Sequence, residues 1–255
     1  MVIEHEAGDL TCTVEAAAPL SELQRHLARA RQMLALDPPG ANELTVGEVF
    51  DRALFGPRAH RYGRPRDLIL GMRARLPGGE VIRGGGKVVK NDAGYDLPKL
   101  FTGARGRLGE LLELTLRLHP LPAATCTLVT QPCDPVVFEP LAPACVDYSG
   151  PDQRLLVRFE SPVAEQLARA AFDVAGGELV RDVEPLWGEQ RARQSGLEPH
   201  PCLPSSCGDT AAALFDAGAT HVMGRWARGW LFADIPAPQR EPTDLERRVI
   251  ARFAA

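Results

Sequence analysis

A glycine-spaced loop that runs directly into an alternating strand constrains the fold of this chain most. Gly103, Gly106 and Gly109 precede a segment with leucine at every second position from Leu112 to Leu118. Such alternation predicts a half-buried β-strand. In the common dinucleotide-binding unit the glycines instead follow a strand and open a helix, so this order excludes that unit. Two interpretations remain: a loop whose backbone lies close to a flat ring or a phosphate, or a tight turn without a ligand.

Charge and composition exclude several classes of function. The 255 residues carry a formal net charge of -4, which provides no general attraction to nucleic acid or to an anionic membrane. Arginines and a histidine concentrate in the segment from Arg58 to Arg66, which we interpret as a solvated face or a partner surface. The length allows two modest domains or one large one.

The cysteines indicate the compartment. Six cysteines occur without a Cys-x-x-Cys pair, the first residues do not resemble a signal peptide, and no apolar run reaches the roughly 18 residues of a membrane span. We therefore expect a cytoplasmic protein with reduced thiols. Cys202 and Cys207, with His200, fit no standard zinc spacing, and we predict no metal site.

The first half of the chain shows clear helix and strand signals. Apolar spacing, alternation and the Pro77-Gly78-Gly79 turn signal define them. The predicted elements are a strand over 10–15, a helix starting near Pro19, a helix over 45–54, a loop over 58–66, a hairpin of 67–76 with 80–83, a helical turn over 96–101 capped by Asp96, and a strand ending at Pro120.

After residue 122 the residue pattern of the sequence changes. We expect a proline-rich stretch without structure over 131–151 and then an alternation of strands and helices. The predicted strands are 154–160, 179–183, 220–225 and 230–235, and the predicted helices are 164–175, 210–217 and 245–253. The fold class is thus α+β, with one domain over 1–122 and a second α+β domain over 123–255.

The glycine loop and its surroundings carry a family resemblance. The run GGGKVVKNDAGYDLPKLFTGARGRLGELLELTLRLHPLP resembles the signature of flavin-linked oxidases of the vanillyl-alcohol oxidase type, and within them the glycolate oxidase subunits. The segments EHEAGDLTCTVEAAAPLSELQRHLARARQMLALDPPG and GPRAHRYGRPRDLILG are similar to the same family. The resemblance implies that 1–122 is the second subdomain of an FAD-binding domain, without the first, and that 123–255 is a ferredoxin-like cap domain.

The resemblance also implies a cofactor site for FAD. The turn after Asp37 and the segment from Thr45 would line the isoalloxazine and the pyrophosphate, and the glycine loop would contact the adenine half. Arg58 and Arg61 are candidates for recognising a substrate carboxylate, and no catalytic residue can be named. The implied cofactor-binding residues are Pro38, Pro39, Thr45, Val46, Gly47, Gly56, Tyr62, Gly63, Asn91, Gly103, Gly106 and Gly109.

Two departures from the family pattern fall in this site. Glu48 stands where the family has the second glycine of a pair, and Asp51 stands at a position that is usually small. A carboxylate near a diphosphate is repelled by about a kcal/mol or more at short range. The family's Arg-Gly-Gly-Gly loop, which cradles the pyrophosphate, belongs to the first subdomain, and Gly84 to Gly86 are no substitute for it, because Lys87 follows them and they lie on the predicted hairpin.

Two functional hypotheses follow. In the first, the chain is an FAD-binding oxidoreductase subunit that oxidises a small 2-hydroxy acid by hydride transfer to flavin, beside a complete flavin subunit and an iron–sulfur subunit. In the second, it is a non-catalytic assembly subunit of such an oxidase with weakened or lost FAD binding.

Overall fold

The computed structural model describes residues 1–86, 96–150, 153–225 and 229–237. These residues pack as two units. Unit 1 contains Met1–Phe55 and Gly63–Leu121, and unit 2 contains Gly56–Tyr62 and the described part of Pro122–Gln239. The short segment Gly56–Tyr62 thus packs with residues that follow it by about a hundred positions, which no local sequence signal indicates.

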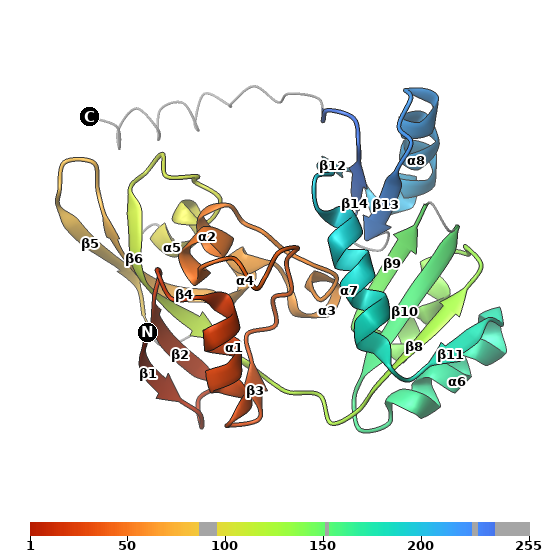
Figure 1. Cartoon of the computed structure of the whole chain (residues 1–255), viewed down its shortest axis with the longest axis horizontal. Helices are drawn as coiled ribbons and strands as arrows, with labels where there is room; N and C mark the ends of the chain where they lie inside the picture. Colours follow the sequence, from red (N-terminus) through yellow and green to blue (C-terminus); the bar gives the residue numbers. More distant parts are fainter. Residues whose placement is uncertain (87–95, 151–152, 226–228, 238–255) are drawn as a thin grey trace. The chain divides into compact units, whose positions relative to one another are not determined.

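Unit 1 is built on an antiparallel five-stranded sheet (Figure 1). Its order is β1 (Val2–Glu6), β2 (Thr11–Glu15), β6 (Glu110–Arg117), β4 (Ile69–Arg75) and β5 (Val81–Gly85). A separate two-stranded ladder joins β3 (Gln32–Met33) and β7 (His119–Pro120). The strand β6 that follows the glycine loop therefore lies at the centre of the sheet.

The register of β2 and β6 places their apolar residues on one face. Cys12 pairs with Leu116 and Val14 with Leu114, and all four are buried. Helices cover this face, since their apolar residues belong to the same core. The helices of unit 1 are α1 (Leu20–Ala28), α2 (Val46–Asp51), α4 (Pro65–Leu68) and α5 (Leu97–Phe101).

Most predicted elements of this half are confirmed. Strand 10–15, the helix after Pro19, the hairpin and the strand before Pro120 all form, and Asp96 caps α5 by accepting a hydrogen bond from the Lys99 amide at 3.2 Å. The predicted loop over 58–66 is wrong. It contains α3 (Ala59–Tyr62) and the start of α4, where Pro65 occupies the first helical turn that proline tolerates.

Unit 2 contains an antiparallel seven-stranded sheet. Its order is β11 (Glu178–Val180), β8 (Thr125–Thr130), β10 (Arg154–Glu160), β9 (Cys145–Ser149), β13 (Val222–Arg225), β14 (Trp230–Ala233) and β12 (Glu198–Pro201). Its helices are α3, α6 (Ala164–Ala175), α7 (Val183–Gln194) and α8 (Cys207–Asp216), with the 3₁₀ turns η1 (Pro135–Leu141) and η2 (Pro204–Ser206).

Both faces of the central strands of unit 2 are buried. In β10, Leu155 and Val157 share a core with α6, whereas Leu156 points into a second core with Trp187 of α7. Every residue of β10 after Arg154 is buried, including the charged Arg158 and Glu160, so the strand shows no alternation between a buried and an exposed face. The α+β class predicted from the sequence is confirmed.

Two expectations about this half are wrong. The stretch 131–151, expected to lack structure, contains η1 and strand β9. Strand β12 was missed because Pro199 and Pro201 argue against a strand; an edge position tolerates them, since one side of an edge strand makes no ladder bonds. The predicted helix 245–253 lies outside the described residues.

Candidate cofactor site

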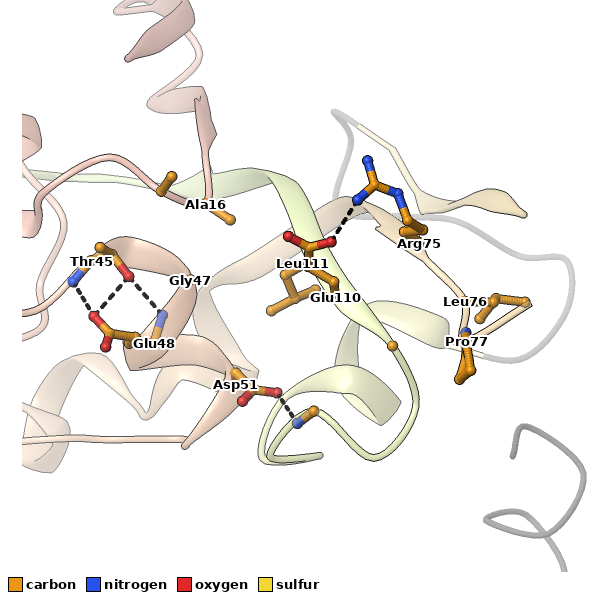
Figure 2. A pocket seen from close by; sticks show the side chains of 13 residues that line it. Ala16, Thr45, Gly47, Glu48, Asp51, Arg75, Leu76, Pro77, Glu110 and Leu111 are labelled. Atoms are coloured by element: carbon orange, nitrogen blue, oxygen red, sulfur yellow. Dashed lines mark hydrogen bonds and ion pairs between the residues drawn. The ribbon is translucent and has the colours of Figure 1, made fainter. Parts of the chain in front are cut away.

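A pocket in unit 1 lies beside the glycine loop (Figure 2). Its volume is about 730 Å³. Its walls come from the end of β2, helix α2, the β4–β5 turn and the start of β6. The lining residues are Ala16, Ala17, Thr45, Gly47, Glu48, Asp51, Arg75, Leu76, Pro77, Gly106, Gly109, Glu110 and Leu111.

The first wall is the N-terminus of α2, which is closed by its own side chains. The Thr45 amide donates to Glu48 Oε2 at 2.8 Å, the Thr45 hydroxyl donates to the same oxygen at 2.9 Å, and the Glu48 amide donates to Thr45 Oγ1 at 3.2 Å. This is a complete capping box. The hydrogen bonds from the Thr45 amide and hydroxyl lower the pKa of Glu48. Glu48 thus occupies donors that would otherwise face the pocket.

The second wall is the glycine loop, which is fastened to the end of α2. The Gly106 amide donates to Asp51 Oδ1 at 2.8 Å (Figure 2), the Arg105 amide to Asp51 O at 2.9 Å and the Gly103 amide to Phe50 O at 3.0 Å. Three amides of this loop are therefore satisfied within the protein. The Asp51 carboxylate sits where an anionic ligand of the Gly106 amide would sit.

The three glycines that line the pocket, Gly47, Gly106 and Gly109, are required for different reasons. A Cβ on Gly109, which has φ +142°, would lie 2.3 Å from Arg75 O, so this position accepts glycine only. Gly106 has φ +72° and no atom within 4 Å of an added Cβ, so conformation alone favours glycine there. A Cβ on Gly47 would come within 2.9 Å of Ala16 Cβ and Ala16 O. Close backbone packing accounts for two of these glycines and backbone conformation for the third.

The pocket is acidic. Its ionisable lining residues are Glu48, Asp51, Glu110 and Arg75. The one guanidinium is in turn paired with a carboxylate, because Arg75 Nη1 lies 2.8 Å from Glu110 Oε2 in an exposed ion pair. Three carboxylates against one paired guanidinium make the pocket unfavourable for a negatively charged group.

Several predicted cofactor residues lie outside this pocket. Val46 is fully buried in the core of unit 1, and Pro38 is buried on the segment after β3. Pro39 and Gly63 are half-buried, and Gly63 (φ +89°) packs against the Asp67 side chain. Among the predicted cofactor residues, the structure brings Thr45, Gly47, Gly106 and Gly109 together in the pocket lining. Asn91 lies outside the described residues.

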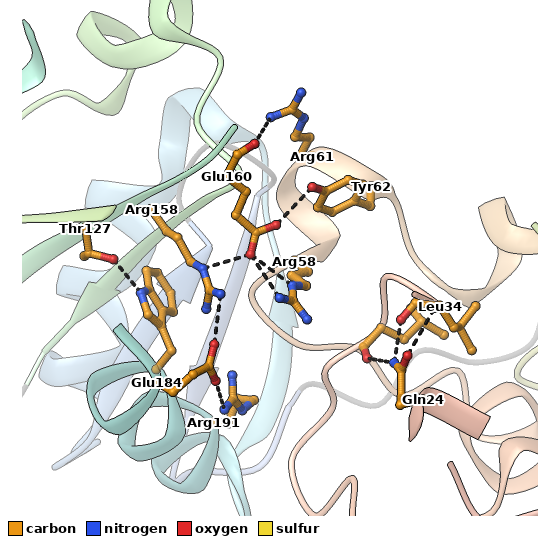
Figure 3. A network of polar contacts seen from close by, with 12 residues as sticks. Gln24, Leu34, Arg58, Arg61, Tyr62, Thr127, Arg158, Glu160, Glu184 and Arg191 are labelled. Atoms are coloured by element: carbon orange, nitrogen blue, oxygen red, sulfur yellow. Dashed lines mark hydrogen bonds and ion pairs between the residues drawn. The ribbon is translucent and has the colours of Figure 1, made fainter. Parts of the chain in front are cut away.

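The remaining candidates lie in unit 2 and contact a buried carboxylate (Figure 3). Glu160, at the end of β10, has a fully buried side chain. Arg58 Nη2 donates to Glu160 Oε1 at 3.0 Å, and the Tyr62 hydroxyl donates to Glu160 Oε2 at 2.9 Å. Arg61 Nη1 donates to Glu160 O at 3.3 Å. Arg58 and Arg61, the candidates for recognising a substrate carboxylate, thus both donate hydrogen bonds to Glu160. Gly56 is buried in the same segment.

Further ion pairs extend this network from Glu160 to Arg158, Glu184 and Arg191. Arg158 Nε lies 2.8 Å from Glu160 Oε1, and its Nη2 lies 2.9 Å from Glu184 Oε1. Arg191 Nη2 lies 3.2 Å from Glu184 Oε2. Burial would raise the pKa of Glu184, but Arg158 and then Arg191 outweigh it and lower that pKa. For Tyr62, burial first and the Glu160 charge second raise the pKa above the usual tyrosine value of 10.0.

Some site residues were missed by the sequence reasoning. Arg75, Glu110 and the Leu76-Pro77 turn line the pocket because β4 and β6 are neighbours in the sheet. A hairpin and a following strand were both predicted, but only their pairing brings these residues to the glycine loop. Glu160 was read simply as the end of a strand.

The described residues contain neither a metal-ligand cluster nor a membrane-spanning helix. No group of three or more His, Cys, Asp and Glu side chains there is arranged to hold a metal. None of the helices in the described ranges combines the length and the apolar character needed to cross a membrane.

Comparison with known proteins identifies the relatives of the chain. The family description "FAD binding domain" matches residues 1–85. Glycolate oxidase subunit GlcE of Escherichia coli is 32% identical over 202 residues, which cover 76% of this chain and 56% of the relative. Glycolate oxidase subunit GlcD of Bacillus subtilis is 33% identical over 128 residues, covering 50% of this chain and 27% of the relative.

The similarity extends to lactate enzymes. The mitochondrial D-lactate dehydrogenase [cytochrome] 1 of Saccharomyces cerevisiae is 33% identical over 129 residues, covering 50% of this chain and 22% of the relative. The chain thus spans about half the length of GlcE and about a quarter of the other two relatives.

Solved structures support the fold alone. Two crystal structures of alkyldihydroxyacetonephosphate synthase have TM-scores of 0.70 and 0.69 at 16% and 14% identity. They cover 99% and 91% of this chain, and the chain covers 63% and 56% of them. The domain match and these relatives agree: the chain is related to FAD-linked oxidoreductases, among them glycolate oxidase subunits and D-lactate dehydrogenases.

Proposed function

We propose that this chain is a subunit of a glycolate-oxidase-type complex that oxidises a small 2-hydroxy acid, and that its own FAD site is weakened. A complete flavin subunit would then carry the redox chemistry, and an iron–sulfur subunit would pass the electrons on. The chain would contribute to assembly. The observation that carries this proposal is that the carboxylates of Asp51 and Glu48 occupy the hydrogen-bond donors of the pocket.

The residues present do not fit a diphosphate in this pocket. A flavin dinucleotide has to place two phosphates against backbone amides and cations. Here the Gly106 amide is satisfied by Asp51, the Thr45 amide and hydroxyl by Glu48, and the Arg75 guanidinium by Glu110. At 4 Å a pair of like charges costs about 1 kcal/mol in water and about 4 kcal/mol at an effective dielectric constant near 20. We therefore derive no chemical step through FAD held by this chain.

The relatives support the choice of complex. GlcE and GlcD are both described as subunits of glycolate oxidase, and the chain is similar to both. Its similarity to GlcE extends over more of the chain than its similarity to GlcD. We place the complex in the cytoplasm, because the six cysteines, all within the described residues, are thiols.

A second candidate function is that of the FAD-dependent oxidoreductase subunit itself. It is favoured by the FAD-binding-domain match over residues 1–85 and by the presence of a pocket of about 730 Å³ beside the glycine loop. In that case Asp51 and Glu48 would have to release their backbone partners when the cofactor binds.

Titration of the purified chain with FAD separates the two candidates. We expect the wild-type protein to be colourless and to bind FAD weakly in equilibrium dialysis. The double variant Asp51→Ala/Glu48→Ala should bind FAD at least about 10-fold more tightly, which corresponds to about 1.4 kcal/mol of relieved repulsion. Glu43→Ala is the matched control, since Glu43 is an exposed acid of unit 1 outside the pocket lining.

Other outcomes would decide differently. A wild-type chain that purifies with one flavin per protein would refute the weakened site and favour the second candidate. Equal FAD affinities for the double variant and for Glu43→Ala would show that the two carboxylates do not control binding. Failure of the chain to co-purify with a co-expressed GlcD-type flavin subunit would contradict the assembly role.

A further inference from the structure

The thiols of Cys202 and Cys207 in unit 2 are in direct contact. Their sulfur atoms are 3.2 Å apart. Cys202 directly follows edge strand β12, and Cys207 is the first residue of α8. The turn η2 lies between them and brings the two positions together. Neither the pocket of unit 1 nor the Glu160 network includes these residues.

The backbone on both sides of the pair is fixed. The Cys202 amide donates to Gly229 O at 2.9 Å, and the Ser206 amide donates to Leu203 O at 2.9 Å. The Cys207 thiol also lies 3.6 Å from Leu203 O. A disulfide needs a sulfur–sulfur distance of about 2.05 Å, so the sulfurs have to approach by roughly 1.2 Å, which side-chain rotation can supply.

The two thiols differ in accessibility. Cys202 is half-buried, whereas Cys207, the first residue of α8, is fully buried. Burial, followed by the hydrogen bond from Cys202, raises the pKa of Cys207 to about 12. An oxidant from solvent therefore meets Cys202 first, and Cys207 is in position to react second.

From this geometry we propose that Cys202 and Cys207 form a reversible disulfide that responds to low-molecular-weight disulfides. The Cys202 thiolate attacks one sulfur of the oxidant, whose S–S bond breaks and releases one thiol. The Cys207 thiolate then attacks the Cys202 sulfur of the mixed disulfide and releases the second thiol. Two protein thiols are oxidised and one small disulfide is reduced to two thiols. The bond ties α8 to the edge strand β12 and closes the exposed segment at Leu203 into a ring.

Oxidised glutathione is the probe for the test on the full chain. After incubation, remaining thiols are alkylated and the protein is mapped by mass spectrometry. We expect Cys202 and Cys207 of the wild-type chain to lose their thiols together and to yield a peptide with a Cys202–Cys207 disulfide, about 2 Da lighter than its reduced form. Dithiothreitol should restore both thiols.

Single variants test the order of the reaction. Cys207→Ser should stop at a glutathione adduct on Cys202, and Cys202→Ser should react at least about 10-fold more slowly at Cys207 because that thiol is buried. Cys133→Ser is the control, since Cys133 is exposed and remote in sequence, and it should leave the cross-link unchanged. A wild-type map with adducts but no Cys202–Cys207 peptide would overturn the proposal, as would a cross-link that pairs either residue with another cysteine. Because the wild-type map decides the question, it stands even if a serine variant fails to fold.

Discussion

The pocket of unit 1 and the Glu160 network of unit 2 use carboxylates in opposite environments. In the pocket, Glu48 is exposed and Asp51 is half-buried, and both accept hydrogen bonds from backbone amides, Glu48 also from a hydroxyl. In the network, Glu160 is fully buried and contacts Arg58, Arg158 and the Tyr62 hydroxyl. In both regions, groups that the sequence offers to a ligand are occupied by an acid of the chain itself.

This difference in environment predicts which of the three carboxylates can be replaced without unfolding the protein. A surface carboxylate on a backbone amide contributes about 1 kcal/mol, because water competes for both partners. A buried carboxylate among guanidinium groups cannot be removed without leaving buried charge, which costs several kcal/mol. We therefore expect the pocket to tolerate replacement of its acids, and unit 2 to be strongly destabilised when the acid of the network is lost.

The largest effect should follow Glu160→Gln. The isosteric amide removes the buried negative charge that faces both Arg58 and Arg158, and unit 2 should lose about 3–5 kcal/mol of stability. All three tryptophans of the chain come after residue 186, so urea unfolding followed by tryptophan fluorescence reports on unit 2. The control is Glu165→Gln, an acid with an exposed ion pair to Arg181, which should lower the stability far less because water screens this pair. Equal losses in the two variants would remove the contrast between buried and surface acids.

Within the glycine loop, Gly109→Ala should lower the free energy of unfolding more than Gly106→Ala does. The added methyl group at Gly109 meets Arg75 O at 2.3 Å and also requires a strained φ, so we expect a loss of about 3 kcal/mol. At Gly106 only the positive φ is unfavourable, and the loss should be about 1 kcal/mol. Thermal unfolding followed by circular dichroism gives both values. A larger loss at Gly106 would mean that the loop does not pack on β4 as described.

Tyr62→Phe tests the Glu160 network at alkaline pH. Its hydroxyl donates to a buried carboxylate, so removal should cost about 1.5–3 kcal/mol at pH 7. Because the folded-state pKa of Tyr62 is raised, its contribution is complete below the ordinary value of 10.0 and is lost as the pH rises through the folded-state value. Stability measured by urea unfolding from pH 8 to 11 should therefore fall more steeply for the wild type than for the variant. Parallel curves would contradict this assignment.

The smallest effect on stability is expected for Thr45→Ala in the pocket, and it should depend on pH in the acidic range. Loss of the cap of α2 should cost about 1 kcal/mol at pH 7. The pKa of Glu48 is lowered, so the contribution of its bond to the Thr45 backbone is present above the ordinary value of 4.5 and is lost as the pH falls through the folded-state value. Amide hydrogen exchange of α2 at pH 7 and at acidic pH measures the difference. Equal protection of α2 in wild type and variant at pH 7 would show that the capping box contributes nothing.

Much of the secondary structure could be predicted because its signals are local. Helix α6 and strand β10 match the predicted ranges 164–175 and 154–160. The failures have a common cause. Strand β12 contains two prolines and is permitted only by its edge position, and β9 lies in a proline-rich stretch that pairs with β10 and β13. Pairing between distant segments decided both.

The candidate site divides in the same way. The spacing of Gly103, Gly106 and Gly109, the loop-into-strand order and the family resemblance were all present in the sequence. The sequence also showed acids at 48 and 51, but not which donors they would occupy.

By itself, the sequence determined the α+β class, the family resemblance and the position of the glycine loop, because periodicity and turn chemistry act over a few neighbouring residues. Only the tertiary structure decided the partners of the functional groups. Asp51 meets the Gly106 amide across 55 positions, and Arg58 meets Glu160 across 102. Such hydrogen bonds depend on how the strands pair and how the helices pack on them, so no local pattern specifies whether a donor faces a ligand or an acid of the same chain.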